Sequence, residues 1–324
     1  MNLTQTAIET LQKFEHQLNP QSPENGYCGV RIIGYGEMST VFTFDDPELK
    51  DFAFKRMPIF QNLTEIDRYE CNYLEYNELL SGLGLKVPEH GSFTISGKST
   101  KVVLYLTQRI LNTDCIGNKV IHRLQKEDSI RLFQAILEKF DVVFRHNQKV
   151  KEDRHLTEVG FDGQMSNWAI VNCDKSMERL QEKFELAYID TSTPLMRKNG
   201  VEQLDPELFL RICPSSLVWI IKLFFLKDVL NRYYDLRLVI IDLIANLFKE
   251  KKEDLIQPFI EVANEYLQEK WTGIKPIQNK EITDYYKEDA MIWRLFLAFR
   301  KVERWIRLKR GKSYDLILPG NIER

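Results

Sequence analysis

The chain has 324 residues, of which 44% are hydrophobic and 28% charged, and its formal net charge at pH 7 is −2. These values are close to the average for globular proteins and provide enough apolar residues for a sizeable core. A chain this close to neutral produces no global field that would attract nucleic acid, so we expect no nucleic-acid partner. Its length corresponds to one large domain or two smaller ones packed together.

The cysteines and the apolar runs bear on the compartment. The cysteines are widely spaced, odd in number and never form a C-x-x-C pair: they are Cys28, Cys71, Cys115, Cys173 and Cys213. This pattern argues against a disulfide framework and a zinc site, and it predicts buried, unpaired thiols in a reducing compartment, the cytoplasm. The N-terminus does not resemble a secretory signal. The most apolar run, Leu217–Leu226, contains Lys222 and is shorter than the roughly 20 residues that span a bilayer.

Residues 1–27 are expected to form an N-terminal helical extension, because polar and apolar residues alternate at helical spacing. Residues 28–112 are typical of a small β lobe. Stretches rich in Val, Ile, Phe and Tyr predict antiparallel strands at 30–33, 41–44, 52–55, 93–95 and 101–107. One helix is expected among them, from about residue 64 to 81, with Thr64 as its N-cap.

Residues 113–324 are predicted to form a larger, mainly helical lobe. Apolar residues with a 3.6-residue period predict helices at 129–144, 215–232, 235–250, 254–269 and 287–308. A pair of strands, 168–172 and 185–190, interrupts them. The expected fold class is therefore α+β with two lobes, and the space between two lobes is a common place for a ligand.

The first candidate site is a glycine-containing turn. A strand runs into Gly34 and Gly36, and Ser39 precedes the next strand. Glycines let a backbone fold tightly over phosphates and direct its N–H groups at them. An ordinary β-hairpin turn explains the G-x-G pattern about equally well.

Next, an apolar strand ends on Lys55, whose ammonium would lie beneath the glycine turn and neutralise α- and β-phosphates. The alternative is an edge-strand lysine in solvent. A lysine in this role needs a carboxylate from the following helix. Glu70 flanks the apolar stripe of that helix and is favoured, whereas Glu75 fits better by its distance to the next motif. Both are kept, and a surface acid is the alternative for each.

The strongest pattern is D-x-x-x-x-N just before a strand, formed by Asp162 and Asn167. The acid can accept a proton from an attacking hydroxyl, and the amide oxygen can bind a metal. The partner strand ends on Asp190, which a hairpin would bring beside Asn167, so that one Mg²⁺ takes oxygen from both. The alternative is that both acids are turn residues.

This ordered series resembles the protein-kinase-like superfamily and is most similar to its aminoglycoside phosphotransferase and choline kinase branch. Val87-Pro88 is similar to a step of that branch, and residues 104–110 resemble the strand and hinge whose backbone receives adenine. The resemblance covers about residues 28–195, whereas residues 200–324 match only in being helical. It implies a bilobal protein-kinase-like fold, ATP and Mg²⁺ as cofactors, and Gln108 and Ile110 as nucleotide contacts.

By this resemblance Lys55 holds the α- and β-phosphates, Asp162 is the catalytic base, and Asn167 and Asp190 hold magnesium. The sequence departs from the family pattern at several positions: Gly160 replaces a usual His, Phe161 a usual Arg or Gly, Thr191-Ser192 a Phe-Gly pair, and Ser39 the third glycine. In relatives the His and Arg are structural supports. Their loss bears on rate and regulation more than on nucleotide binding.

The leading hypothesis is an ATP- and Mg²⁺-dependent phosphotransferase that acts on a hydroxyl of a small molecule. No A-P-E segment follows Asp190, which disfavours a protein kinase and fits a small acceptor. The main alternative is a catalytically weak pseudokinase that binds nucleotide as a scaffold or sensor. A protein kinase and an enzyme that transfers AMP are further alternatives.

The C-terminal end of the chain is basic and amphipathic. Seven cations are interleaved with Trp293, Phe296, Trp305 and Ile306: they are Arg300, Lys301, Arg304, Arg307, Lys309, Arg310 and Lys312. A solvated helix face is the first interpretation, and contact with an anionic membrane surface or ligand is the second.

Overall fold

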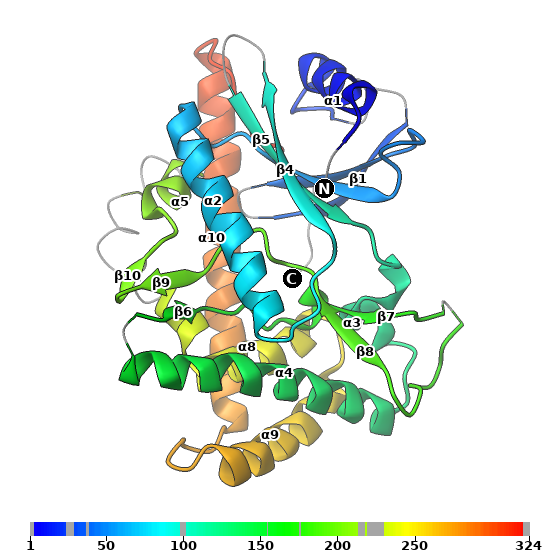
Figure 1. The fold of residues 1–324 in the computed structure, drawn as a ribbon, viewed down its shortest axis with the longest axis vertical. Helices are drawn as coiled ribbons and strands as arrows, with labels where there is room; N and C mark the ends of the chain where they lie inside the picture. Colours follow the sequence, from blue (N-terminus) through cyan, green and yellow to red (C-terminus); the bar gives the residue numbers. More distant parts are fainter. Residues whose placement is uncertain are drawn as a thin grey trace.

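The computed structural model describes residues 3–23, 29–36, 39–97, 102–153, 155–174, 176–212, 218 and 230–319. A β-rich lobe lies above a larger helical lobe (Figure 1). This α+β architecture confirms the expected fold class. The helix expected at 215–232 falls almost entirely outside the described residues, as do Cys28 and Cys213.

The β lobe is an antiparallel sheet of five strands in the order β1-β2-β3-β5-β4. Every strand expected from the sequence is present: β1 (Val30–Tyr35), β2 (Thr40–Phe44), β3 (Phe52–Met57), β4 (His90–Ser96) and β5 (Val102–Arg109). Helix α2 (Leu63–Gly82) follows β3. Its N-cap is Asn62, whose side chain accepts from Glu65 N at 3.0 Å, so the expectation that Thr64 caps the helix is wrong. Asn62 and Thr64 are both acceptable caps by residue type, and only the backbone angles distinguish them.

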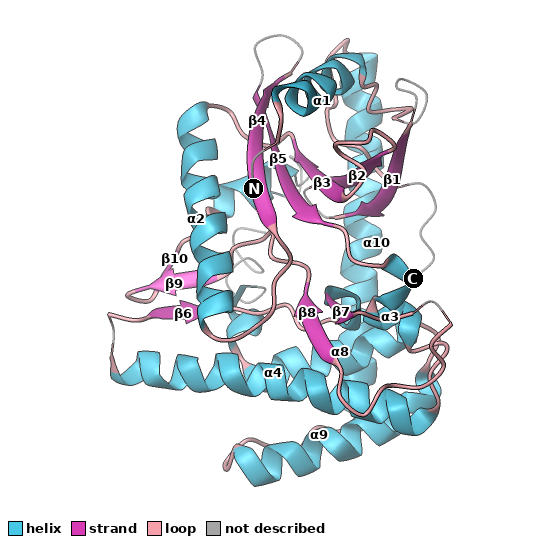
Figure 2. Ribbon diagram, turned by 45° about the vertical axis from the view of Figure 1, so that its right-hand side comes forward, coloured by secondary structure: helices cyan, strands magenta, loops and turns pink. Residues whose placement is uncertain are grey.

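The sheet is covered on both faces, because alternate residues of a strand point to opposite sides. On β5, Val103 and Tyr105 belong to the cluster that contains helix α1 (Gln5–Gln17), whereas Leu104 and Leu106 belong to the cluster that contains α2. Phe14 of α1 makes edge contacts with the Phe42 and Phe44 rings at 5.0 and 5.2 Å. The N-terminal helix therefore packs on the outer face of the sheet (Figure 2).

A buried ion pair fixes α1 to the sheet. Glu15 accepts two hydrogen bonds of 2.7 Å from Arg56 of β3 and a third bond from the Tyr105 hydroxyl. The remaining Arg56 nitrogen donates to the Asp315 carbonyl at 2.8 Å. The two ends of the chain thus meet on one buried guanidinium of the β lobe.

Four of the helices expected in the helical lobe are confirmed: α4 (Lys126–Glu152), α8 (Leu236–Lys249), α9 (Ile256–Lys270) and α10 (Asn279–Lys309). Helices α4 and α10 are longer than expected, and two short helices that the sequence did not predict are also present, α3 (Gly117–Val120) and α5 (Pro206–Ile212). Helix α10 runs from the base of the helical lobe up to the β sheet in both views (Figures 1 and 2). Among the described residues, no helix combines the length and the apolar character that a membrane crossing requires.

The described residues of this lobe also include five short strands. The expected hairpin consists of β7 (Trp168–Val171) and β8 (Glu185–Tyr188), which pair with Trp168 opposite Tyr188. A second sheet joins β10 (Val201–Glu202), β9 (Met196–Lys198) and β6 (Thr157–Val159). The sequence did not predict this second sheet, because strands of two or three residues are too short for an alternating pattern to appear.

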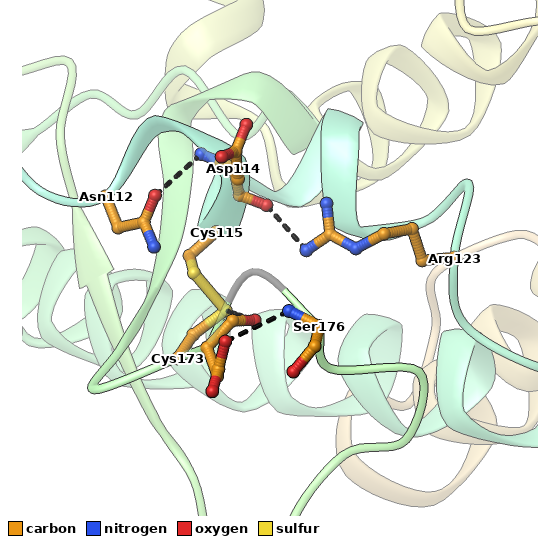
Figure 3. The surroundings of a disulfide bond; sticks show 7 residues. Asn112, Asp114, Cys115, Arg123, Cys173 and Ser176 are labelled. Carbon is orange, nitrogen blue, oxygen red and sulfur yellow. Dashed lines mark hydrogen bonds between the residues drawn. A yellow bond between two sulfur atoms is a disulfide. The ribbon is translucent and has the colours of Figure 1, made fainter.

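A disulfide joins Cys115 and Cys173, whose Cα atoms lie 5.8 Å apart (Figure 3). The two backbones are neighbours because Ile116 forms a β-bridge with Ala169. The expectation of unpaired cysteines is therefore wrong for this pair, and the inference of a reducing compartment loses its basis. Cys71 is free but exposed, which corrects the expectation of a buried thiol.

Candidate functional site

A cavity of about 440 Å³ lies between the glycine turn, the end of β5 and the β7–β8 hairpin. Its size is typical of small-molecule sites. Seven of the residues selected from the sequence line it: Gly34, Gly36, Lys55, Gln108, Ile110, Asn167 and Asp190. Residues up to 156 positions apart in the chain therefore face one space.

The Lys55 ammonium and the Asp190 carboxylate form the central pair of this cavity, with Nζ 3.3 Å from Oδ1. The Ser192 hydroxyl bonds to both groups, donating to Asp190 at 2.8 Å. Burial opposes ionisation of Asp190, but Lys55 and the Ser192 hydrogen bonds more than offset it and lower the pKa of the carboxyl. Ser192 departs from the protein-kinase-like sequence pattern. In the structure its hydroxyl is hydrogen-bonded to both Lys55 and Asp190.

Neither helix glutamate pairs with Lys55, which corrects that expectation. Glu70 accepts a hydrogen bond from Ser92 of β4, and Glu75 pairs with Lys198 of β9 at 2.6 Å. The face of α2 toward the site carries tyrosines instead, and the Tyr69 hydroxyl donates to the Ser192 carbonyl at 2.7 Å. Aromatic side chains need this buried face, so the acids are displaced to its two edges.

The glycine turn lies close to Lys55. Gly36 N donates to the Ser39 carbonyl at 2.9 Å, and a Cβ on Gly36 would lie 3.6 Å from Lys55 Cε. The side chain of Ser39 is buried, and its hydroxyl has no hydrogen-bond partner among the described residues. Ser39 itself is absent from the residues that line the cavity.

At the other end of the cavity, Gln108 lies in β5, where it is paired with Ala53 and His90, and Ile110 directly follows the strand. Ile110 N donates to the Asp51 carbonyl at 2.8 Å, and Arg109 N donates to the Glu89 carbonyl at the same distance. These two N–H groups are thus already used within the β lobe, so neither is free to donate to a nucleotide base. The Gln108 side-chain nitrogen is buried without a hydrogen-bond partner among the described residues.

The loop before β7 holds Asp162 and Asn167 together. Gln164 N donates to Asp162 Oδ1 at 3.3 Å, and Asn167 Nδ2 donates to the Asp162 carbonyl at 3.1 Å. Ile189 N then donates to the Asn167 carbonyl at 2.9 Å, which brings the end of β8 beside the loop. Burial, with the nearby carboxylates of Asp242 and Asp190, raises the pKa of Asp162 to about 7.

Tight packing explains the two unusual residues before Asp162. A Cβ on Gly160 would lie 2.8 Å from the Tyr234 ring and 2.9 Å from Leu195 Cβ, so no histidine fits there. The Phe161 ring stacks on Tyr188 with centroids 4.5 Å apart and is fully buried. Aromatic packing therefore supports this loop just before Asp162.

A polar network on α8, which the sequence analysis did not identify, lies behind the loop. Lys249 donates to the Gln164 side chain at 3.4 Å and to Asn246 at 2.8 Å, and Asn246 donates to Asp242 at 3.2 Å. Asp242 is buried, and burial raises its pKa although Arg232 acts in the opposite direction. A buried acid inside the apolar run 236–247 was the available signal, since such an acid needs partners.

The donor set at this end of the cavity suits magnesium. The Asn167 amide nitrogen is held by the Asp162 carbonyl, which directs its oxygen to the opposite side of the planar group. Asn167 and Asp190 both line the cavity and offer an amide and a carboxylate oxygen, the ligands that Mg²⁺ prefers. Phosphates and water would complete such a site.

Residues 22–304 match the model of a family of unknown function, DUF6206. The chain belongs to this family. No curated protein matches the DUF6206 chain. Among solved structures it is similar to the GDP complex of wild-type aminoglycoside 2'-phosphotransferase-IIIa and to that of a point mutant, at 10% and 11% identity. The matches cover 81% and 75% of this chain and 98% and 92% of those chains, both with a TM-score of 0.31, and a likeness at that level carries no argument about the site.

Proposed function

We propose that this member of DUF6206 binds ATP with Mg²⁺ in the cavity between its lobes and transfers a phosphoryl group to a hydroxyl of a small molecule. The observation that supports this proposal is the meeting of Lys55, Asp190 and Asn167 in one cavity beneath the glycine turn. A lysine ammonium and a divalent metal are the groups that neutralise the phosphate charges of a bound nucleotide.

Each residue has a distinct part in this proposal. Lys55 exchanges its contact with Asp190 for the α- and β-phosphates, and Asn167 and Asp190 hold the metal, which would neutralise charge on the transferred group. Asp162 accepts the proton of the acceptor hydroxyl. Its pKa of about 7 lies near the range in which a general base works best at neutral pH. The Gln108 amide, which has no partner among the described residues, is the candidate contact for the base.

The experiment that tests the proposal measures melting temperature with nucleotides and divalent metals, followed by transfer from γ-labelled ATP to hydroxyl-bearing metabolites. We expect Mg-ATP to raise the melting temperature and Asp162→Asn to retain that increase but lose transfer. Label on the protein itself would indicate a protein kinase, and label transferred from α-labelled ATP would indicate AMP transfer. Absence of any nucleotide effect in the wild type would contradict the proposal.

A second candidate is a pseudokinase that binds nucleotide without transferring phosphate. One structural observation favours it. No glutamate of α2 forms an ion pair with Lys55, and the Lys55 ammonium instead donates hydrogen bonds to Asp190 and Ser192. In this case Mg-ATP raises the melting temperature, but no phosphate leaves the nucleotide during long incubation with any acceptor.

A further inference from the structure

Helix α10 exposes a row of large apolar side chains along its described residues. Those exposed by more than a third are Met291, Ile292, Leu295, Val302, Trp305, Ile306 and Leu308. Trp305 is 57% exposed, Met291 55% and Val302 53%, values far above those of core residues. Contiguous exposed apolar surface of this kind marks a site of contact with another protein or a membrane.

Five of these residues form a continuous line, which we call the apolar stripe: Met291, Leu295, Val302, Trp305 and Ile306. Their spacing of 4, 7 and 3 or 4 residues keeps them on one side of an α-helix. Trp293, Leu297 and Arg300, which are buried, occupy the opposite side and fix α10 to the protein. With 1.5 Å per residue, the stripe extends over roughly 22 Å.

Positive charge surrounds the apolar stripe. Apart from the buried Arg300, the sequence from Met291 to Lys312 has seven Lys or Arg residues and one acid, Glu303, although the whole chain has a net charge of −2. That acid accepts a hydrogen bond from Arg307 at 3.1 Å. Lys309 lies over the exposed Trp305 ring, with its ammonium 4.0 Å from the ring centroid.

We propose that the apolar stripe of α10 docks on an anionic membrane surface and lies in the plane of its interface. Apolar side chains would enter the acyl boundary while the surrounding cations meet acidic headgroups. An exposed Trp beside Lys is suited to this boundary, because its ring is apolar and its N–H is polar. A second copy of the chain is disfavoured as the occupant, since two such helices would repel each other.

The test is co-sedimentation of the full chain with phosphatidylcholine vesicles, with and without phosphatidylserine. We expect binding to the vesicles that contain phosphatidylserine, at least about tenfold stronger than to phosphatidylcholine alone and weakened steeply by salt. Both Leu295→Ser/Val302→Ser/Trp305→Ser and Lys301→Gln/Lys309→Gln/Lys312→Gln should reduce the bound fraction by about tenfold or more.

Matched controls separate docking from general stickiness or misfolding. Leu63→Ser/Val201→Ser removes equally exposed apolar residues, and Lys13→Gln/Lys50→Gln/Lys126→Gln removes exposed lysines elsewhere. Both controls should bind vesicles as the wild type does, and all variants should keep the wild-type melting temperature. Equal binding to both vesicle types, or unchanged binding by the stripe variant, would overturn the proposal.

Other occupants give different results and would also overturn it. A concentration-dependent dimer that the stripe variant abolishes, without vesicle binding, would assign the stripe to a second copy. Binding to an acidic polypeptide such as polyglutamate, without vesicle binding, would assign it to an acidic protein partner.

Discussion

Lys55 and Asp190 lie 135 residues apart in the chain, and the structure places the lysine Nζ 3.3 Å from the carboxylate Oδ1. β3 carries the lysine and the segment after β8 carries the acid, so this contact joins the two lobes across the cavity. A triphosphate bound here would separate the pair. Lys55 would then contact the phosphates, and Asp190 would contact the metal.

Asp162→Asn tests the role of the buried acid. Because the folded-state pKa of Asp162 is raised to about 7, the wild type loses stability as pH rises from about 4 to 7, and the neutral amide avoids this loss. We expect the variant to be more stable at pH 8 by on the order of 1–2 kcal/mol, with no difference near pH 4, as measured by urea unfolding. A destabilised variant at pH 8 would show that the carboxylate is favoured in the folded state.

The pH dependence of phosphoryl transfer by the wild type should follow the titration of Asp162. A general base must be deprotonated, so the rate should rise with pH up to about 7 and then stay constant. The measurement is the initial rate of acceptor phosphorylation between pH 5 and 9. A rate independent of pH across this range would remove Asp162 from the base role.

The disulfide should stabilise the site region. Cys115→Ser/Cys173→Ser opens a loop of 58 residues, and we expect it to lower the free energy of unfolding by about 2–4 kcal/mol. Urea unfolding with and without reductant measures this, and reductant should have no effect on the double variant. Cys71→Ser, at an exposed free cysteine, is the control and should be neutral.

The close contacts of the loop before β7 make Gly163 intolerant of a side chain. A Cβ there would collide with the Phe140 ring and lie 2.7 Å from Val239, so Gly163→Ala should destabilise the fold by about 1–3 kcal/mol. Gly82→Ala is the control, because nothing lies within 4 Å of its Cβ position at the end of α2. The measurement is thermal unfolding of both variants. Equal melting temperatures would contradict this prediction and would mean that the loop can shift to accept a Cβ at residue 163.

The buried pair between α1 and the sheet should be costly to break. Glu15→Ala leaves the Arg56 guanidinium buried without its carboxylate, which should reduce stability by about 3–5 kcal/mol. Glu89→Ala, which removes the exposed partner of Arg109, should change it by less than about 1 kcal/mol. Similar losses of unfolding free energy in the two variants would contradict the prediction that the buried pair is the costlier one to break.

Much of the fold followed from local patterns. Alternating apolar residues predicted all five strands of the β lobe, and the 3.6-residue period predicted α2, α4, α8, α9 and α10 within a few residues to either side at most ends. The candidate residues Lys55, Asn167 and Asp190 also proved to face one cavity, because a motif of fixed order constrains where its members meet.

What sequence could not supply were contacts between distant elements. Whether Glu70 or Glu75 reaches Lys55 depends on the rotation of α2, which the buried tyrosines determine. The Cys115–Cys173 bond depends on the β-bridge between Ile116 and Ala169, which no cysteine spacing reveals. The absence of a histidine at Gly160 has its cause in Tyr234, 74 positions later.

The central claim is that Lys55 and Asp190, and not a helix glutamate, form the nucleotide site. Calorimetric titration of Mg-ATP into the wild type, Lys55→Met, Asp190→Asn and Glu70→Gln tests it most directly. We expect binding by the wild type and by Glu70→Gln with similar affinity, and binding at least about tenfold weaker in the other two variants, a difference of about 1.4 kcal/mol. Loss of binding in Glu70→Gln equal to that in Lys55→Met, or no binding of Mg-ATP to the wild type, would contradict it.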